Sequence, residues 1–116
     1  MHDITEGGLA AALAELSMAG DHMIRVNINQ IPIYPETQKI CDVLGINPLG
    51  LIGSGSLLIC CRRTESQKLI QRIKAAGIDI CCIGEVMGSG QGIHAYKGDE
   101  EVTWPSFEAD EITKLF

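Results

Sequence analysis

The sequence predicts a layered α/β or α+β fold, in which a mixed β-sheet is covered by helices. Segments with the apolar spacing of helices alternate along the chain with short strand-like segments, and glycine or proline separates them. A glycine-dense stretch near residue 90 separates two strand-like segments and predicts a closing hairpin. The length of 116 residues, with 46% hydrophobic and 21% charged residues, fits one globular domain over 1–116. The expected order is α, β, α, β, α, β, β, β, α.

The N-terminal part of the chain is predicted to form a helix followed by a strand. Leucines recur at helical spacing in an alanine-rich segment, namely Leu9, Leu13 and Leu16. The helix is expected over residues 7–19, with Gly20 at its C-terminal end. From His22 apolar and polar residues alternate, which predicts a strand whose dry face carries Ile24, Val26 and Ile28.

The middle of the chain predicts two more helices around a buried strand. Pro35 suits the first turn of a helix that stops at Gly45 and carries Ile40, Val43 and Leu44. The continuous apolar run 57–61 predicts a central strand covered on both faces. Thr64 and Gln67 have the spacing of a capping box for a helix that ends at Gly77. Its inner stripe is expected to be Leu69, Ile70, Ile73 and Ala76.

The C-terminal part is predicted to complete the sheet. Residues 78–86 are expected to form a buried strand, joined by the turn 88–92 to a strand that starts at Ile93. Residues 102–104 predict a short edge strand, and 107–116 an amphipathic helix. We interpret His22 and His94 as ordinary strand residues and Trp104 as a core or interface residue.

Charge and hydropathy exclude two classes of partner. The net charge is −6, and no basic run is available to neutralise the phosphates of a nucleic acid. The apolar runs are far shorter than the ~20 residues that a membrane-spanning helix needs, and no signal-like start is present. We therefore expect a cytoplasmic protein with neither nucleic acid nor membrane as its partner.

The five cysteines have no disulfide pattern, because their number is odd and four of them form two adjacent pairs. The pairs are Cys60-Cys61 and Cys81-Cys82, and the fifth residue is Cys41. A four-thiolate zinc site is the alternative, but its paired ligands are usually two to four residues apart. We therefore predict no metal, and interpret the cysteines as buried structural thiols on adjacent strands.

The strongest functional signal lies at the start of the chain, at residues 2–9, immediately before the first helix. Glycines there can expose the first backbone N–H groups of a helix to an oxyanion, which the helix dipole also attracts. Thr5 can cap the helix or donate to that anion, and Asp3 can accept from a substrate or approach a phosphate-bound magnesium ion. The candidate nucleotide- or substrate-binding residues are Asp3, Thr5, Gly7 and Gly8. An ordinary helix cap is the alternative, and we find no nucleophile with a paired base and hence no catalytic residue.

The same residues carry a family resemblance. The segment His-Asp-Ile-Thr-Glu-Gly-Gly-Leu at 2–9 resembles the opening of the C-terminal domain of the AIR synthase (PurM) superfamily, especially its HypE and AIR synthase-related branches. Further similar segments follow in the same order, so the resemblance covers nearly the whole chain. They are Asn47-Pro48-Leu49, residues 54–59, residues 76–78 and residues 83–86.

The resemblance implies a two-domain, dimeric enzyme that uses ATP and Mg²⁺ to activate a substrate oxygen by phosphoryl transfer. In such enzymes an N-terminal domain supplies most of the nucleotide site and the C-terminal domain closes over it. We expect this chain to lack that N-terminal ATP-binding domain, to associate with itself, and to be inactive toward ATP when isolated. HypE-like members carry their substrate on a C-terminal cysteine, whereas this chain ends in residues 112–116, Ile-Thr-Lys-Leu-Phe.

Two other glycine clusters lie at residues 53–56 and 88–92. Residues 53–56 can present N–H groups and hydroxyls to a ligand, although a glycine-rich entry to a buried strand is more commonly a bulge or tight bend. Residues 88–92 are most simply a hairpin loop.

The alternative to an enzyme domain is a non-catalytic binding or assembly module. It would use the apolar surface of the first helix, formed by Ala10, Ala11, Ala12 and Ala14.

Overall fold

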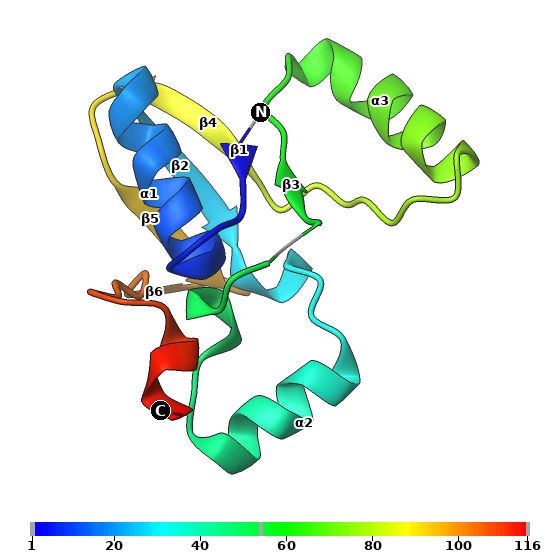
Figure 1. Ribbon diagram of the computed structural model, residues 1–116. Coiled ribbons are helices and arrows are strands. Elements are labelled where there is room, and N and C mark those ends of the chain that lie inside the picture. The colour runs from blue at the N-terminus through cyan, green and yellow to red at the C-terminus, as the bar shows by residue number, and fades with distance from the viewer. Residues whose placement is uncertain (1, 54, 116) are drawn as a thin grey trace.

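A computed structural model describes residues 2–53 and 55–115 of the chain (Figure 1). Helix α1 (Gly8–Gly20) lies against a four-stranded mixed sheet, to which strand β2 (His22–Asn27) is central. The other helices, α2 (Pro35–Leu44) and α3 (Arg63–Ala75), extend away from this unit, as Figure 1 shows. The predicted mixed α/β architecture is therefore confirmed.

The sheet has the strand order β4-β2-β5-β6, with β4 (Gly84–Ser89), β5 (Ile93–Lys97) and β6 (Glu100–Val102). Strand β2 runs antiparallel to β4 and parallel to β5, and β6 is the antiparallel edge strand. The expected hairpin between β4 and β5 is wrong, because β2 lies between them. Their connection crosses the start of β2, where the Gly90 N–H donates to the Asp21 carbonyl and the Ile24 N–H donates to the Gly92 carbonyl.

The core forms where α1 meets the sheet. Leu13 packs with Ile24 and Val26, whose side chains are the two buried members of the predicted dry face of β2. The third expected member, Ile28, instead begins a short 3₁₀ helix, η1 (Ile28–Gln30). Trp104 packs against this core, and its Nε1–H donates to the Ala10 carbonyl at 3.2 Å, which confirms its packing role.

The predicted boundaries of α1 and α2 hold to within one residue, and Pro35 and Gly45 lie at the ends of α2 as predicted, but the caps of α1 and α3 differ from expectation. Asp21 (φ 53°), and not Gly20, takes the left-handed position after α1. Helix α3 begins at Arg63 without a side-chain cap, so Thr64 lies inside its first turn and the predicted capping box does not form. Of its predicted inner stripe, Ala76 lies beyond the helix end and is exposed.

The expected buried strands on either side of α3 are the main error in the fold prediction. Only Leu57–Leu58 form a strand, β3, which pairs with the two-residue β1 (His2–Asp3), and residues 78–83 have no regular structure. Strand β4 starts at Gly84 and is exposed along its length.

The prediction that the cysteines are buried on adjacent strands is wrong, because the predicted strands do not form at the two cysteine pairs. Cys41 is buried on α2, but the other four cysteines lie outside strands and are exposed, namely Cys60, Cys61, Cys81 and Cys82. All five are free thiols. Among residues 2–53 and 55–115 no three His, Cys, Asp or Glu side chains are grouped to hold a metal ion. The metal content of the protein stays a prediction.

The C-terminal end also differs from the predicted helix over 107–116. After β6 the chain runs without regular structure to a 3₁₀ helix, η3 (Glu111–Leu115), and Phe116 lies outside the described residues. A second 3₁₀ turn, η2 (Pro48–Gly50), lies next to α1. No helix in the described part of the chain is long and apolar enough to cross a membrane.

Candidate functional site

The N-terminal motif forms a turn between β1 and α1. Asp3 ends β1, and Gly7 is the N-cap of α1 with φ 84°, followed by Gly8 with φ 66°. Both glycines are buried, whereas the side chains of Asp3 and Thr5 are exposed. The positive φ values explain why the turn needs glycine at two consecutive positions. The structure thus brings all four predicted residues into one turn.

Thr5 does not cap the helix with its side chain. The N-cap residue of α1 is Gly7, which has no side chain that could accept a hydrogen bond from the first turn. The carbonyl of Thr5 accepts from the Gly8 N–H at 3.0 Å. The backbone turn therefore takes the place of the expected cap. The Thr5 hydroxyl is exposed, so it can meet a ligand.

The N-terminal turn is held by the glycine cluster at residues 53–56. Ile4 pairs with residues 53–56: the Gly53 N–H donates to the Ile4 carbonyl at 3.1 Å, and the Ile4 N–H donates to the Ser56 carbonyl. Gly53 also accepts from the Ser56 N–H at 2.9 Å, which closes a tight turn. The glycine cluster thus serves the bend that the sequence offered as one of two explanations, and it lies beside the N-terminal motif. Ser54 lies outside the described residues.

Gly8 has a packing role that the sequence did not reveal. A Cβ atom at this position would overlap the backbone carbonyls of Leu49 and Leu51. The Asn47 side chain fixes that backbone by accepting from the Leu49 N–H at 3.0 Å. The Cα of Gly8 therefore faces the interior of the chain, and the role of Gly8 in ligand binding stays a prediction.

The first backbone donor of the site is already paired. The Gly7 N–H donates to Oδ2 of Asp110 at 3.0 Å, in a buried hydrogen bond that joins residues 103 positions apart. Oδ1 of the same carboxylate accepts from the Ile112 N–H and so begins η3. The helix N-terminus therefore holds an oxyanion, supplied by the chain itself. Sequence reasoning missed Asp110, and its Asp-x-Ile-Thr spacing, typical of a helix start, was the available signal.

Glu111 joins the same segment to η2. Its Oε1 accepts from the Asn47 N–H at 2.8 Å, and its Oε2 pairs with Lys114 Nζ at 2.8 Å. The hydrogen bond from Lys114 and the one from the Asn47 backbone hold the pKa of the Glu111 carboxyl below its usual range. At neutral pH Glu111 is therefore ionised and bonded, although its side chain is only 3% exposed.

The alanines of α1 are largely used inside the domain. Ala10 and Ala12 are each 2% exposed, and Ala11 and Ala14 are half-buried. Strand β2, strand β5 and η2 lie against α1, and the Trp104 Nε1–H donates to the Ala10 carbonyl. The expected apolar docking surface on α1 is therefore mostly covered by the chain's own residues.

A comparison with protein families decides the identity of this fold. A family model described as the C-terminal domain of AIR synthase related protein matches residues 1–97. The chain belongs to this family. The match includes the whole N-terminal turn and the segments that support it, whereas Asp110 and Glu111 lie beyond it.

Similar sequences occur in hydrogenase expression/formation proteins and in carbamoyl dehydratases. A hydrogenase expression/formation protein of Methanocaldococcus jannaschii is 32% identical over 74 residues, which are 64% of this chain and 22% of that protein. The carbamoyl dehydratase HypE of Rhizobium leguminosarum is 29% identical over 93% of this chain and 33% of its own length. The chain thus spans a third or less of the length of these relatives.

Solved structures similar to this chain have the same fold. The crystal structure of Escherichia coli HypE, a hydrogenase maturation protein, matches 91% of this chain and 35% of its own with a TM-score of 0.76 at 24% identity. A chain from the HypE-HypF complex matches 89% of this chain and 35% of its own with a TM-score of 0.78 at 25% identity. The AIR synthase-related fold assigned from sequence is therefore confirmed.

Proposed function

We propose that this chain is the C-terminal substrate- and phosphate-binding domain of a cytoplasmic, ATP-dependent enzyme of the AIR synthase-related or HypE-like type. That enzyme would activate a substrate oxygen by phosphoryl transfer. The observation that carries the proposal is the N-terminus of α1, where Gly7 donates to a carboxylate and the exposed Asp3 and Thr5 side chains lie in the same turn.

The geometry supports phosphate recognition by the turn and the first residues of α1. Gly8 is held against Leu49 and Leu51, so the turn is supported from behind and its conformation is fixed. Thr5 offers a hydroxyl donor, and the helix dipole favours an anion at this end of α1. Asp3 would contact a substrate group or a magnesium ion bound to the phosphates.

The residues present fit part of a Mg²⁺·ATP complex. Transfer of a phosphoryl group requires Mg²⁺ held by several oxygen ligands, with donors placed around the transferred group. Asp3 is the one carboxylate that we assign to this role from the described residues. The remaining ligands would come from an N-terminal ATP-binding domain, and the isolated domain would bind a phosphorylated ligand weakly without turning it over. A homodimer is the proposed assembly of the complete enzyme.

The test is a titration of the isotopically labelled chain with inorganic pyrophosphate and with Mg²⁺·ATP, followed by NMR. We expect shifts of the amides of residues 5–10, and Thr5→Val should weaken binding about tenfold, the effect of about one hydrogen bond. Thr64→Val is the matched control, because Thr64 is an exposed threonine near the start of another helix, and it should change the Kd less than about twofold.

Two results would contradict the proposal. Equal affinities of the two threonine variants, or shifts confined to another surface, would remove phosphate from this turn. Magnesium-dependent phosphate release by the chain alone, abolished by Asp3→Asn, would mean that the chain carries the catalytic groups that we assign to another domain.

A further inference from the structure

We propose that residues 105–115, the C-terminal strap, act as an internal gate on the α1 anion site, with the Asp110 carboxylate in the place of a bound phosphate oxygen. This inference rests on the proposed function of that site. It adds a regulatory element, because a phosphorylated ligand must displace Asp110 from Gly7 before it can use the first backbone donor of the helix.

The gate is built on a direct competition for one donor. The Gly7 N–H donates to Asp110 at 3.0 Å, and this bond is buried, with Asp110 only 7% exposed. A carboxylate and a phosphate are both oxyanions and prefer the same donor at the positive end of the helix. A dianionic phosphate beside the Asp110 carboxylate would also be repelled. The closed strap and the fully seated ligand therefore exclude each other.

The strap is positioned by polar anchors on η2. Glu111 accepts from the Asn47 N–H and is held by Lys114, three residues further along η3. The Glu111 side chain and the Phe107 ring also pack so close to Gly50 that a Cβ atom there would overlap both. These contacts place Asp110 opposite Gly7 and make the closed state specific.

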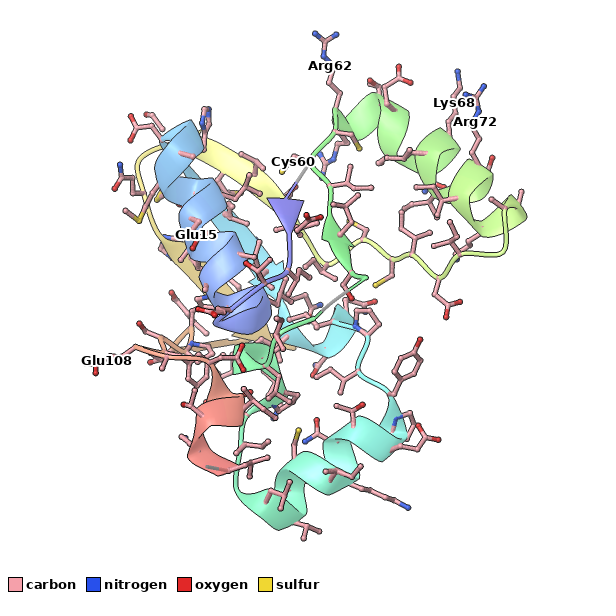
Figure 2. The ribbon with its side chains drawn as sticks, viewed as in Figure 1. Glu15, Cys60, Arg62, Lys68, Arg72 and Glu108 are labelled. Atoms are coloured by element: carbon pink, nitrogen blue, oxygen red, sulfur yellow. The ribbon has the colours of Figure 1, made fainter. Side chains whose placement is uncertain are left out.

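The rest of the strap is weakly attached, which allows it to open locally. Ile112 and Leu115 are 38% and 43% exposed, and η3 has only five residues. Figure 2 shows the Glu108 side chain pointing away from the body of the molecule. Segments with few buried apolar contacts open at a small fraction of the free energy of global unfolding. The strap can thus release Gly7 while the core of Leu13, Ile24 and Val26 stays folded.

The experiment compares two substitutions that remove the same charge from the strap. Asp110→Asn removes the charged acceptor at Gly7, and Glu108→Gln removes a charge at an exposed position of the same segment. With inorganic pyrophosphate as the probe in calorimetric titration, we expect Asp110→Asn to lower the Kd about fivefold to tenfold. Glu108→Gln should change it less than about twofold.

A second variant keeps the test informative if Asp110→Asn loosens the fold. Lys114→Gln weakens the Glu111 anchor and leaves Asp110 in place. It makes the chain more negative, so simple electrostatics predicts weaker pyrophosphate binding, whereas an opened strap predicts stronger binding. Faster hydrogen exchange of the Gly7 amide in both variants, with the core amides still protected, would accompany opening.

The possible results of the pyrophosphate titrations distinguish a failure of the proposed gate from a failure of the proposed anion site. A wild-type chain that binds pyrophosphate at the Thr5 turn as tightly as Asp110→Asn overturns the gate and leaves the proposed function standing. Binding that is tighter in both Asp110→Asn and Lys114→Gln supports both. If no variant binds pyrophosphate or Mg²⁺·ATP at millimolar concentrations, both the proposed function and the gate are wrong.

Discussion

Helices α1 and α3 each have 13 residues and each carry large aliphatic residues at helical spacing, but they occupy opposite environments. Helix α1 has five buried residues, and α3 has none. In Figure 2 the labelled side chains Arg62, Lys68 and Arg72 project from the α3 end of the molecule away from the other elements. Apolar spacing thus predicts a helix and its inner face, whereas the size of the side chains determines how deeply the helix can be buried.

Small residues explain the depth of α1. Gly8, Ala10 and Ala12 let the backbone of η2 and the Trp104 indole approach the helix directly, while Leu13 fills the space above the sheet. Ser17 is 1% exposed, and its hydroxyl donates to the His22 carbonyl and accepts from the Gly92 N–H. Helix α1 is therefore covered from more than one side, and its buried polar residue, Ser17, is hydrogen-bonded.

Long charged side chains keep α3 at the surface. Its apolar stripe of Leu69, Ile70 and Ile73 is only half-buried, because the segments on either side of the helix form almost no sheet to cover it. Arg63 joins the helix to Glu85 of β4 at 3.1 Å, but the Arg63 side chain is 90% exposed. An ion pair of that kind stabilises little.

The largest expected effect comes from truncating one leucine in each helix. Leu13→Ala should lower the free energy of unfolding by about 3 kcal/mol, because Leu13 is 3% exposed and its removal leaves a cavity against Ile24 and Val26. Leu69→Ala removes the same atoms from a half-buried site and should cost about 1 kcal/mol. Urea denaturation of the wild type and both variants measures the difference. Equal losses would mean that α3 is as firmly packed as α1.

The second effect separates close packing from backbone strain. Gly8 and Gly45 have nearly the same φ, 66° and 69°, but a Cβ atom on Gly8 would overlap the Leu49 and Leu51 carbonyls whereas one on Gly45 would meet nothing within 4 Å. Gly45→Ala should therefore cost about 1 kcal/mol, the price of the left-handed conformation alone. Gly8→Ala should cost about 3 kcal/mol, since overpacking is added to that strain.

Thermal unfolding of both glycine variants measures this difference, with pyrophosphate binding as a second readout. If Gly8→Ala were as stable as Gly45→Ala and lost only pyrophosphate binding, Gly8 would face the ligand as the sequence alone suggested. That result would refute the packing role of Gly8.

The elements that could be predicted from sequence are those with local signals. Helices α1 and α2 and strand β2 follow from apolar spacing and from Pro35 and Gly45. The position of β2 between β4 and β5 could not be predicted, because strand partners are chosen by long-range pairing. The turn around Asp3, Thr5, Gly7 and Gly8 was identifiable from its glycines. The contact between Asp110 and Gly7 was not, because it joins residues 103 positions apart and no local pattern specifies it.

The smallest expected effect on stability comes from modifying the thiols around α3. Iodoacetamide should alkylate the exposed cysteines of the native chain, namely Cys60, Cys61, Cys81 and Cys82, and leave Cys41 unmodified until the protein unfolds. Cys41 is 1% exposed, and burial, together with the nearby Asp42 and Glu111 carboxylates, raises the pKa of its thiol. Burial and the adjacent Cys82 raise the pKa of the Cys81 thiol, whose Sγ donates to the Gln30 carbonyl, so Cys81 should be alkylated most slowly of the four exposed cysteines.

Because these four thiols lie outside the α1 core, their alkylation should change the free energy of unfolding by less than about 1 kcal/mol. Peptide mapping by mass spectrometry at successive times, followed by urea denaturation of the labelled chain, measures both quantities. Unfolding of the chain on labelling would show that the region around α3 is needed for the stability of the fold, and equal rates for Cys41 and Cys60 would contradict the burial of Cys41.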